Sequence, residues 1–119
     1  MSFHFISHPW LVREVEDGIL VSLTPADLDQ MAVSIFVDEM LELGMENGRL
    51  HLYLDFAAIE QIRSIMIGKV LAIQKHLSEF NGRVILFNLR EGVAECFAAA
   101  GIGDLVDIRG EDDAPTFGM

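Results

Sequence analysis

The sequence predicts an α/β fold with a single mixed β-sheet of about four or five strands and helices interleaved between them. Short apolar runs alternate with longer segments of helical periodicity, which is typical of a sheet covered by helices. Asp17-Gly18 joins the first two runs and indicates an antiparallel hairpin. Helical segments separate the later runs, which favours parallel strands with right-handed crossovers.

The hairpin is expected from residues 11–16 and 19–23. An Asp-Gly pair between such runs predicts a type I′ turn, because both central residues of that turn need positive φ. The fold should therefore open with an antiparallel ribbon at one edge of the sheet.

One continuous helix is predicted over residues 25–43. Thr24 can cap it and Pro25 suits its first position. The side chains expected to face the core are Leu28, Ala32, Ile35, Phe36, Met40 and Leu43. Further apolar residues widen this arc, which is either buried between the sheet and the hairpin or forms a homodimer face.

The remaining elements follow from shorter patterns. The sequence predicts strands at 50–55, 83–87 and 105–108, and helices at 64–80 and 91–100. Asn81-Gly82 should end the first of these helices. The length predicts one domain over residues 1–119, with a core at about 11–108 and an acidic tail at 109–119.

Composition disfavours several classes of function. The formal net charge of −11 disfavours nucleic acid and anionic membranes as partners, because both are bound largely through Lys and Arg. No apolar run approaches the roughly 20 residues of a membrane-spanning helix, and the first ten residues do not resemble a signal peptide. We therefore expect a cytoplasmic protein. The single cysteine, Cys96, excludes an intramolecular disulfide framework.

Three segments resemble the sulfate-transporter and anti-sigma-factor-antagonist (STAS) domain family. The first is the hairpin followed at once by a helix. The second is LYLDFAAI, two further residues and then IRSIMIGKVL, which is similar to the family's strand, turn and second helix. The third is RVILFNLREGVAECFAAAGIGDLVDI, which is similar to the family's closing strand, helix and strand. Together the segments span residues 11–108, and the resemblance implies a STAS-like fold.

The resemblance also implies a function. Members that stand alone antagonise anti-sigma factors: they bind a serine kinase that sequesters a sigma factor, and phosphorylation by that kinase ends the binding. The acceptor is a Ser or Thr at the start of the second helix, and Ser64 matches it when Asp55 and Gly68 serve as anchors. The chain is therefore expected to be an anti-sigma-factor-antagonist-like binding module that has no cofactor and is not an enzyme.

Residues around the acceptor are expected to contact the partner: Arg63, Ile65, Met66, Lys69 and Asp29. Three of them depart from the family pattern. Arg63 stands where the family usually has Asp, and Ile65 and Met66 replace small residues. Asp29 resembles the acidic member of a Leu-Asp pair near the family's first helix.

Ser64 at a helix start suits a switch, because unpaired N–H groups and the helix dipole stabilise a phosphate there. The phosphate adds about −1.5 to −2 charge, which disfavours a tight interface. Arg63 could pair with that phosphate, repel a basic partner or attract an acidic one. The plainer interpretation is that Ser64 is an ordinary N-cap.

Other functions are weighed against this one. A STAS domain can also scaffold or sense a small ligand without phosphorylation. The four histidines are scattered and none has a metal-ligand spacing with Cys96, so no metal site is expected. No catalytic grouping or glycine-rich phosphate loop is visible, which disfavours an enzyme.

Overall fold

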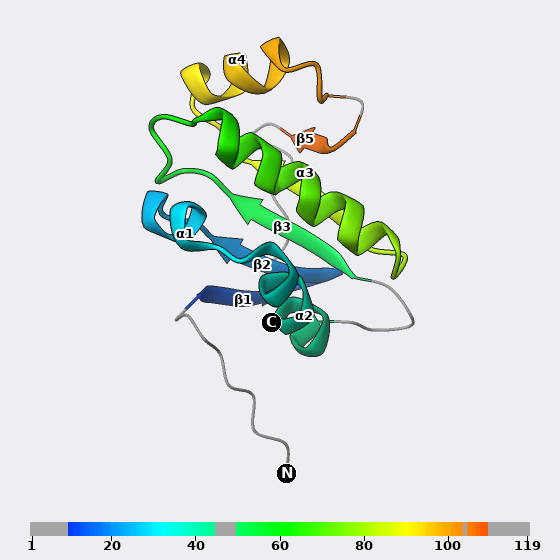
Figure 1. Ribbon diagram of the computed structural model, residues 1–119. Coiled ribbons are helices and arrows are strands. Elements are labelled where there is room, and N and C mark those ends of the chain that lie inside the picture. Colours follow the sequence, from blue (N-terminus) through cyan, green and yellow to red (C-terminus); the bar gives the residue numbers. More distant parts are fainter. Residues whose placement is uncertain (1–9, 45–49, 104, 110–119) are drawn as a thin grey trace.

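The computed structural model describes residues 10–44, 50–103 and 105–109. Within these residues, five strands form one mixed sheet in the order β1-β2-β3-β4-β5 (Figure 1). β1 runs antiparallel to β2, and the other neighbours are parallel. The prediction of a single mixed sheet with interleaved helices is confirmed. The predicted tail lies outside the described residues except for Arg109, which belongs to β5.

The elements follow the predicted order. They are β1 Leu11–Val15, β2 Gly18–Ser22, α1 Pro25–Gln30, α2 Val33–Gly44, β3 His51–Asp55, α3 Ser64–Ser78, β4 Arg83–Phe87, α4 Glu91–Ala99 and β5 Asp107–Arg109. The final strand begins two residues later than expected. α3 ends at Ser78, two residues before the predicted end. The predicted stop signal at Asn81-Gly82 is confirmed, because Asn81 takes a φ of 58° and the Gly82 N–H donates to the Leu77 carbonyl.

The hairpin forms, but the prediction of its turn is wrong. Val15 pairs with Gly18, so the connecting residues are Glu16 and Asp17, and none of these residues has a positive φ. Gly18 is required for a different reason. A Cβ atom there would lie 2.0 Å from the carbonyl oxygen of His51 on the neighbouring strand. The glycine therefore permits close approach of β2 to β3.

The prediction of one continuous helix over 25–43 is also wrong. Met31 adopts an extended conformation (φ −62°, ψ 125°), which separates α1 from α2. The break buries the Met31 side chain. Because α2 does not continue the helical turn of α1, a different set of its side chains faces the core. Ala32, Ile35 and Leu43 were expected to face the core and are exposed instead.

Alternating side chains of the strands separate two apolar clusters. Ile19 and Val21 belong to the larger cluster, which also contains the buried apolar side chains of all four helices. Figure 1 shows α2 and α3 against this side of the sheet. The smaller cluster lies on the opposite face and consists of Val15, Leu20, Tyr53, Ile85 and Phe87.

Candidate functional site

The segment between β3 and α3 is fixed at the carboxyl end of the sheet. The Asp55 carboxylate accepts hydrogen bonds from the Ala57 N–H at 2.9 Å and from the Asn88 side-chain amide at 3.1 Å. Phe56 and Ile59 are fully buried, so they anchor the segment in the larger cluster. These contacts give the start of α3 a defined position next to the end of β3.

Ser64 is the first residue of α3, and it is exposed. The N-cap is Arg63, whose backbone is extended and whose side chain makes no capping hydrogen bond. The interpretation of Ser64 as an ordinary N-cap is therefore wrong. The Arg63 carbonyl accepts the first helical bonds, from Met66 at 2.9 Å and Ile67 at 3.2 Å. Within the described residues, the Ser64 hydroxyl has no hydrogen-bond partner.

Arg63 is paired with Asp29. Its guanidinium donates to the Asp29 carboxylate, which brings the end of α1 against the start of α3. The Arg63 side chain is 64% exposed and that of Asp29 is 45% exposed. Exposed pairs of this kind contribute roughly 0.2–1 kcal/mol, so the pair orients these side chains without holding them firmly.

Lys69 reinforces the same junction. Its ammonium group donates to the carbonyl oxygens of Leu28 at 2.6 Å and Asp29 at 2.8 Å. The last carbonyls of a helix lack helical partners, so these bonds cap the C-terminal end of α1. Lys69 thus ties α1 to α3 through the main chain.

The two apolar residues after Ser64 differ in exposure. Ile65 is 62% exposed, whereas Met66 is 4% exposed and packs in the larger cluster. The exposed isoleucine leaves apolar surface open to solvent beside Ser64. Gly68 is also exposed, and a Cβ atom there would meet nothing within 4 Å.

A shallow groove of about 380 Å³ lies beside the start of α3. It is lined by Pro25, Asp29, Ala58, Glu60, Gln61, Arg63 and Met66. Three of these residues, Asp29, Arg63 and Met66, are among those predicted to contact the partner. The segment at 58–61 also lines the groove and was not predicted. That segment carries no motif of its own, although its place directly before the predicted acceptor was a usable signal.

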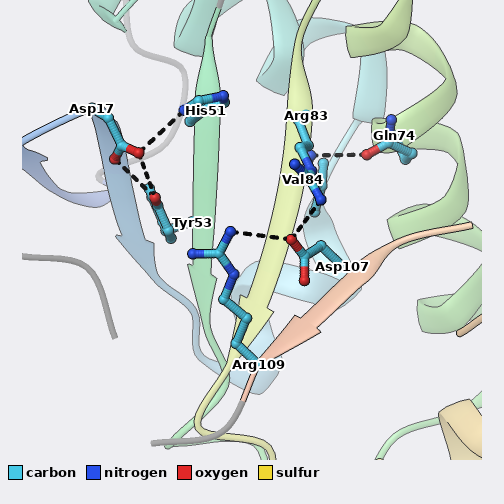
Figure 2. Close-up of polar contacts among 8 residues, drawn as sticks. All are labelled: Asp17, His51, Tyr53, Gln74, Arg83, Val84, Asp107 and Arg109. Carbon is cyan, nitrogen blue, oxygen red and sulfur yellow. Dashed lines mark hydrogen bonds and ion pairs between the residues drawn. The ribbon is translucent and has the colours of Figure 1, made fainter. Parts of the chain in front are cut away.

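A second group of polar side chains links the strands on the other face of the sheet (Figure 2). The Tyr53 hydroxyl donates to Asp17 at 2.8 Å, and His51 Nδ1 lies 3.3 Å from the same carboxylate. Asp107 accepts from Arg83 at 2.8 Å and from Arg109 at 3.2 Å.

This second group brings together side chains of the hairpin turn, β3, β4 and β5, and it includes the buried Tyr53. Burial raises the pKa of Tyr53, and the hydrogen bond to Asp17 raises it further. The parts of the chain that the structure describes contain no cluster of three potential metal ligands. They also contain no helix long and apolar enough to cross a membrane.

Comparison with known proteins rests on structure. No protein-family model and no curated protein matches the sequence. The crystal structure of TM1081 from Thermotoga maritima, a candidate anti-sigma factor antagonist, superposes with a TM-score of 0.67 at 21% identity, covering 88% of this chain and 89% of that chain.

Two further structures agree. RsbS from Moorella thermoacetica gives a TM-score of 0.64 at 18% identity, covering 82% of this chain and 85% of that one. The anti-sigma factor antagonist SpoIIAA in its unphosphorylated form gives 0.63 at 18% identity, covering 88% and 91%. The chain therefore has the STAS-like fold that its sequence pattern resembles.

Proposed function

We propose that this chain is an anti-sigma-factor-antagonist-like binding module whose partner is a serine kinase that acts as an anti-sigma factor. The partner binds the surface at the start of α3, and phosphorylation of Ser64 ends the binding. The chain is then a regulatory binding protein and not an enzyme. The observation that carries the proposal is the exposed hydroxyl of Ser64 at the first residue of α3.

The surroundings of Ser64 support both binding by the unmodified chain and loss of binding after phosphorylation. Ile65 offers exposed apolar surface, and Asp29 and Arg63 offer charged groups beside it. The N–H groups of the first helical turn and the helix dipole stabilise a phosphate on Ser64, so the modification leaves the fold intact. A charge of about −2 under an interface must be desolvated or repelled, and the affinity falls.

The test is affinity capture of the kinase by the wild-type chain, Ser64→Ala and Ser64→Asp. Ser64→Ala should bind at least as well as the wild type and should not be released by ATP. Ser64→Asp should bind more weakly, by about tenfold or more if the charge removes at least 1.4 kcal/mol. Equal binding by the two variants would contradict the proposal.

Ser34 provides a matched control. It is an exposed serine in the first turn of α2. Ser34→Asp adds the same charge at a comparable helix position, and it should leave capture unchanged. Weakening by Ser34→Asp equal to that by Ser64→Asp would mean that net charge, and not the start of α3, controls binding.

The groove beside Ser64 favours one alternative, a STAS domain that senses a small ligand without phosphorylation. Its volume of about 380 Å³ lies within the range of small-molecule sites. In that case the chain isolated from its own cells would carry no phosphate, and binding of the partner would depend on the ligand.

A further inference from the structure

We propose that phosphorylation of Ser64 makes Arg63 exchange partners, leaving the Asp29 carboxylate for the new phosphate. The exchange would make a modification at one residue change the charge of the surface where α1 meets α3. This inference deepens the proposed function and rests on it for its role in the cell. It concerns a residue, Arg63, at which the chain departs from the family pattern.

The unmodified chain supplies the starting state. The Arg63 guanidinium donates to Asp29, 34 residues away in the sequence. Both side chains are largely hydrated, at 64% and 45% exposure, so water competes with the pair and screens it. A stronger acceptor close to Arg63 can therefore displace Asp29.

A phosphate on Ser64 is such an acceptor. Adjacent Cα atoms lie about 3.8 Å apart, and an arginine side chain is long enough to reach back to its neighbour's phosphate. The phosphate carries about −1.5 to −2 charge and three acceptor oxygens, compared with −1 and two oxygens for Asp29. Its geometry also suits bidentate pairing with the planar guanidinium.

The exchange would change the groove without moving the backbone. Lys69 holds the main-chain carbonyls of Leu28 and Asp29, so the end of α1 stays against α3. The Asp29 side chain would lose its counter-charge in a groove that the carboxylate residue Glu60 also lines. The two-state element is thus the Arg63 side chain, and the surface offered to a partner becomes more negative in the modified state.

The test follows the Arg63 Nε–Hε resonance by NMR in the full-length chain. The chain is made in two forms, unmodified and with phosphoserine incorporated at position 64 during synthesis. The signal is identified by its loss in Arg63→Lys. Asp29→Asn is then introduced into both forms, because it removes the carboxylate charge and keeps the shape of the side chain.

Asp29→Asn should shift the Arg63 signal in the unmodified chain and leave it in place in the phosphorylated chain. An equal shift in both forms would mean that Arg63 stays on Asp29, which overturns the proposal. A signal insensitive to Asp29→Asn in both forms would overturn it as well, because the starting pair would not exist. Asp38→Asn, which alters an exposed carboxylate on α2, is the control and should shift the signal in neither form.

The outcome is separable from that of the proposed function. No kinase is needed to make the phosphorylated chain, so a failed exchange leaves regulation by phosphorylation standing. Conversely, a chain that no kinase modifies in cells would refute the proposed function while the exchange could still be observed.

Discussion

Tyr53 is the only tyrosine of the chain, so its titration can be followed directly by ultraviolet absorbance. It is 2% exposed, and its hydroxyl donates to Asp17. Burial is the largest cause of its raised pKa, followed by the hydrogen bond and the charge of Asp17. We expect a titration midpoint above the ordinary value of 10.0 in the folded protein. A midpoint at or below that value would contradict the buried placement of the hydroxyl.

Asp17→Asn separates the two causes. The variant removes the carboxylate charge, so the pKa of Tyr53 should fall, but it should remain above the ordinary value because burial persists.

The raised pKa of Tyr53 also makes the stability of the fold depend on pH. The folded state holds the phenolic proton more tightly, so its contribution is complete below pH 10 and is lost as pH rises through the folded-state pKa. The loss should be absent in Tyr53→Phe.

Gly18 is required by close approach of two strands. In Gly18→Ala the new Cβ atom would lie 2.0 Å from the backbone oxygen of His51, which belongs to the sheet and cannot move cheaply. We expect a loss of about 1–3 kcal/mol in the free energy of unfolding, measured by urea denaturation. Gly68→Ala is the matched control. It should stabilise by about 0.5–1 kcal/mol, because its Cβ atom meets nothing and alanine favours a helix. A destabilising Gly68→Ala would mean that this helix face is packed.

At the scale of elements, the junction of α1 and α3 depends on Lys69. Lys69→Met keeps the length of the side chain and removes both hydrogen bonds to the end of α1. We expect a loss of about 1–2 kcal/mol and faster hydrogen exchange at the amides of α1. Lys75→Met changes an exposed lysine of the same helix and should alter stability by only a few tenths of a kcal/mol. Equal effects of the two variants would contradict the role of Lys69.

The elements that were predicted correctly follow from residues close to them in the sequence. The elements that were predicted wrongly depend on contacts with residues far away in the sequence. The strand at 83–87 and the stop at Asn81-Gly82 follow from apolar runs and turn residues nearby. The break between α1 and α2 has no local signal, because Met31 is a good helix former and its extended backbone serves its burial. The turn at Glu16-Asp17 was missed because the glycine beside it serves strand packing.

At the scale of the whole molecule, the fold could be predicted because strand and helix periodicities alternate along the chain. The candidate site could be predicted only in part. The position of Ser64 follows from the order of the elements, whereas its surroundings do not. Arg63 meets Asp29 across 34 residues, and Lys69 meets the Leu28 carbonyl across 41. The hydrophobic periodicity of the sequence does not predict such contacts, because they form only when elements distant in the sequence pack together.

A homodimer face on the helix predicted at 25–43 remains one of two alternatives, and exposed apolar side chains of α2 could form it. Ile35 is 50% exposed and Leu43 is 38% exposed, both on α2. If copies associate there, Ile35→Lys should lower the mass measured by sedimentation equilibrium and leave the fold intact. An unchanged mass would exclude this part of α2 from the contact.

The central claim is that Ser64 is modified in the cell, and the intact mass of the chain isolated from its own cells tests it most directly. Samples taken under several growth states should include a form heavier by one phosphate, and fragmentation should place that phosphate on Ser64. The Ser64→Ala chain expressed in the same cells should lack the heavier form. The absence of phosphate under every growth state, or a phosphate on another residue, would contradict the account.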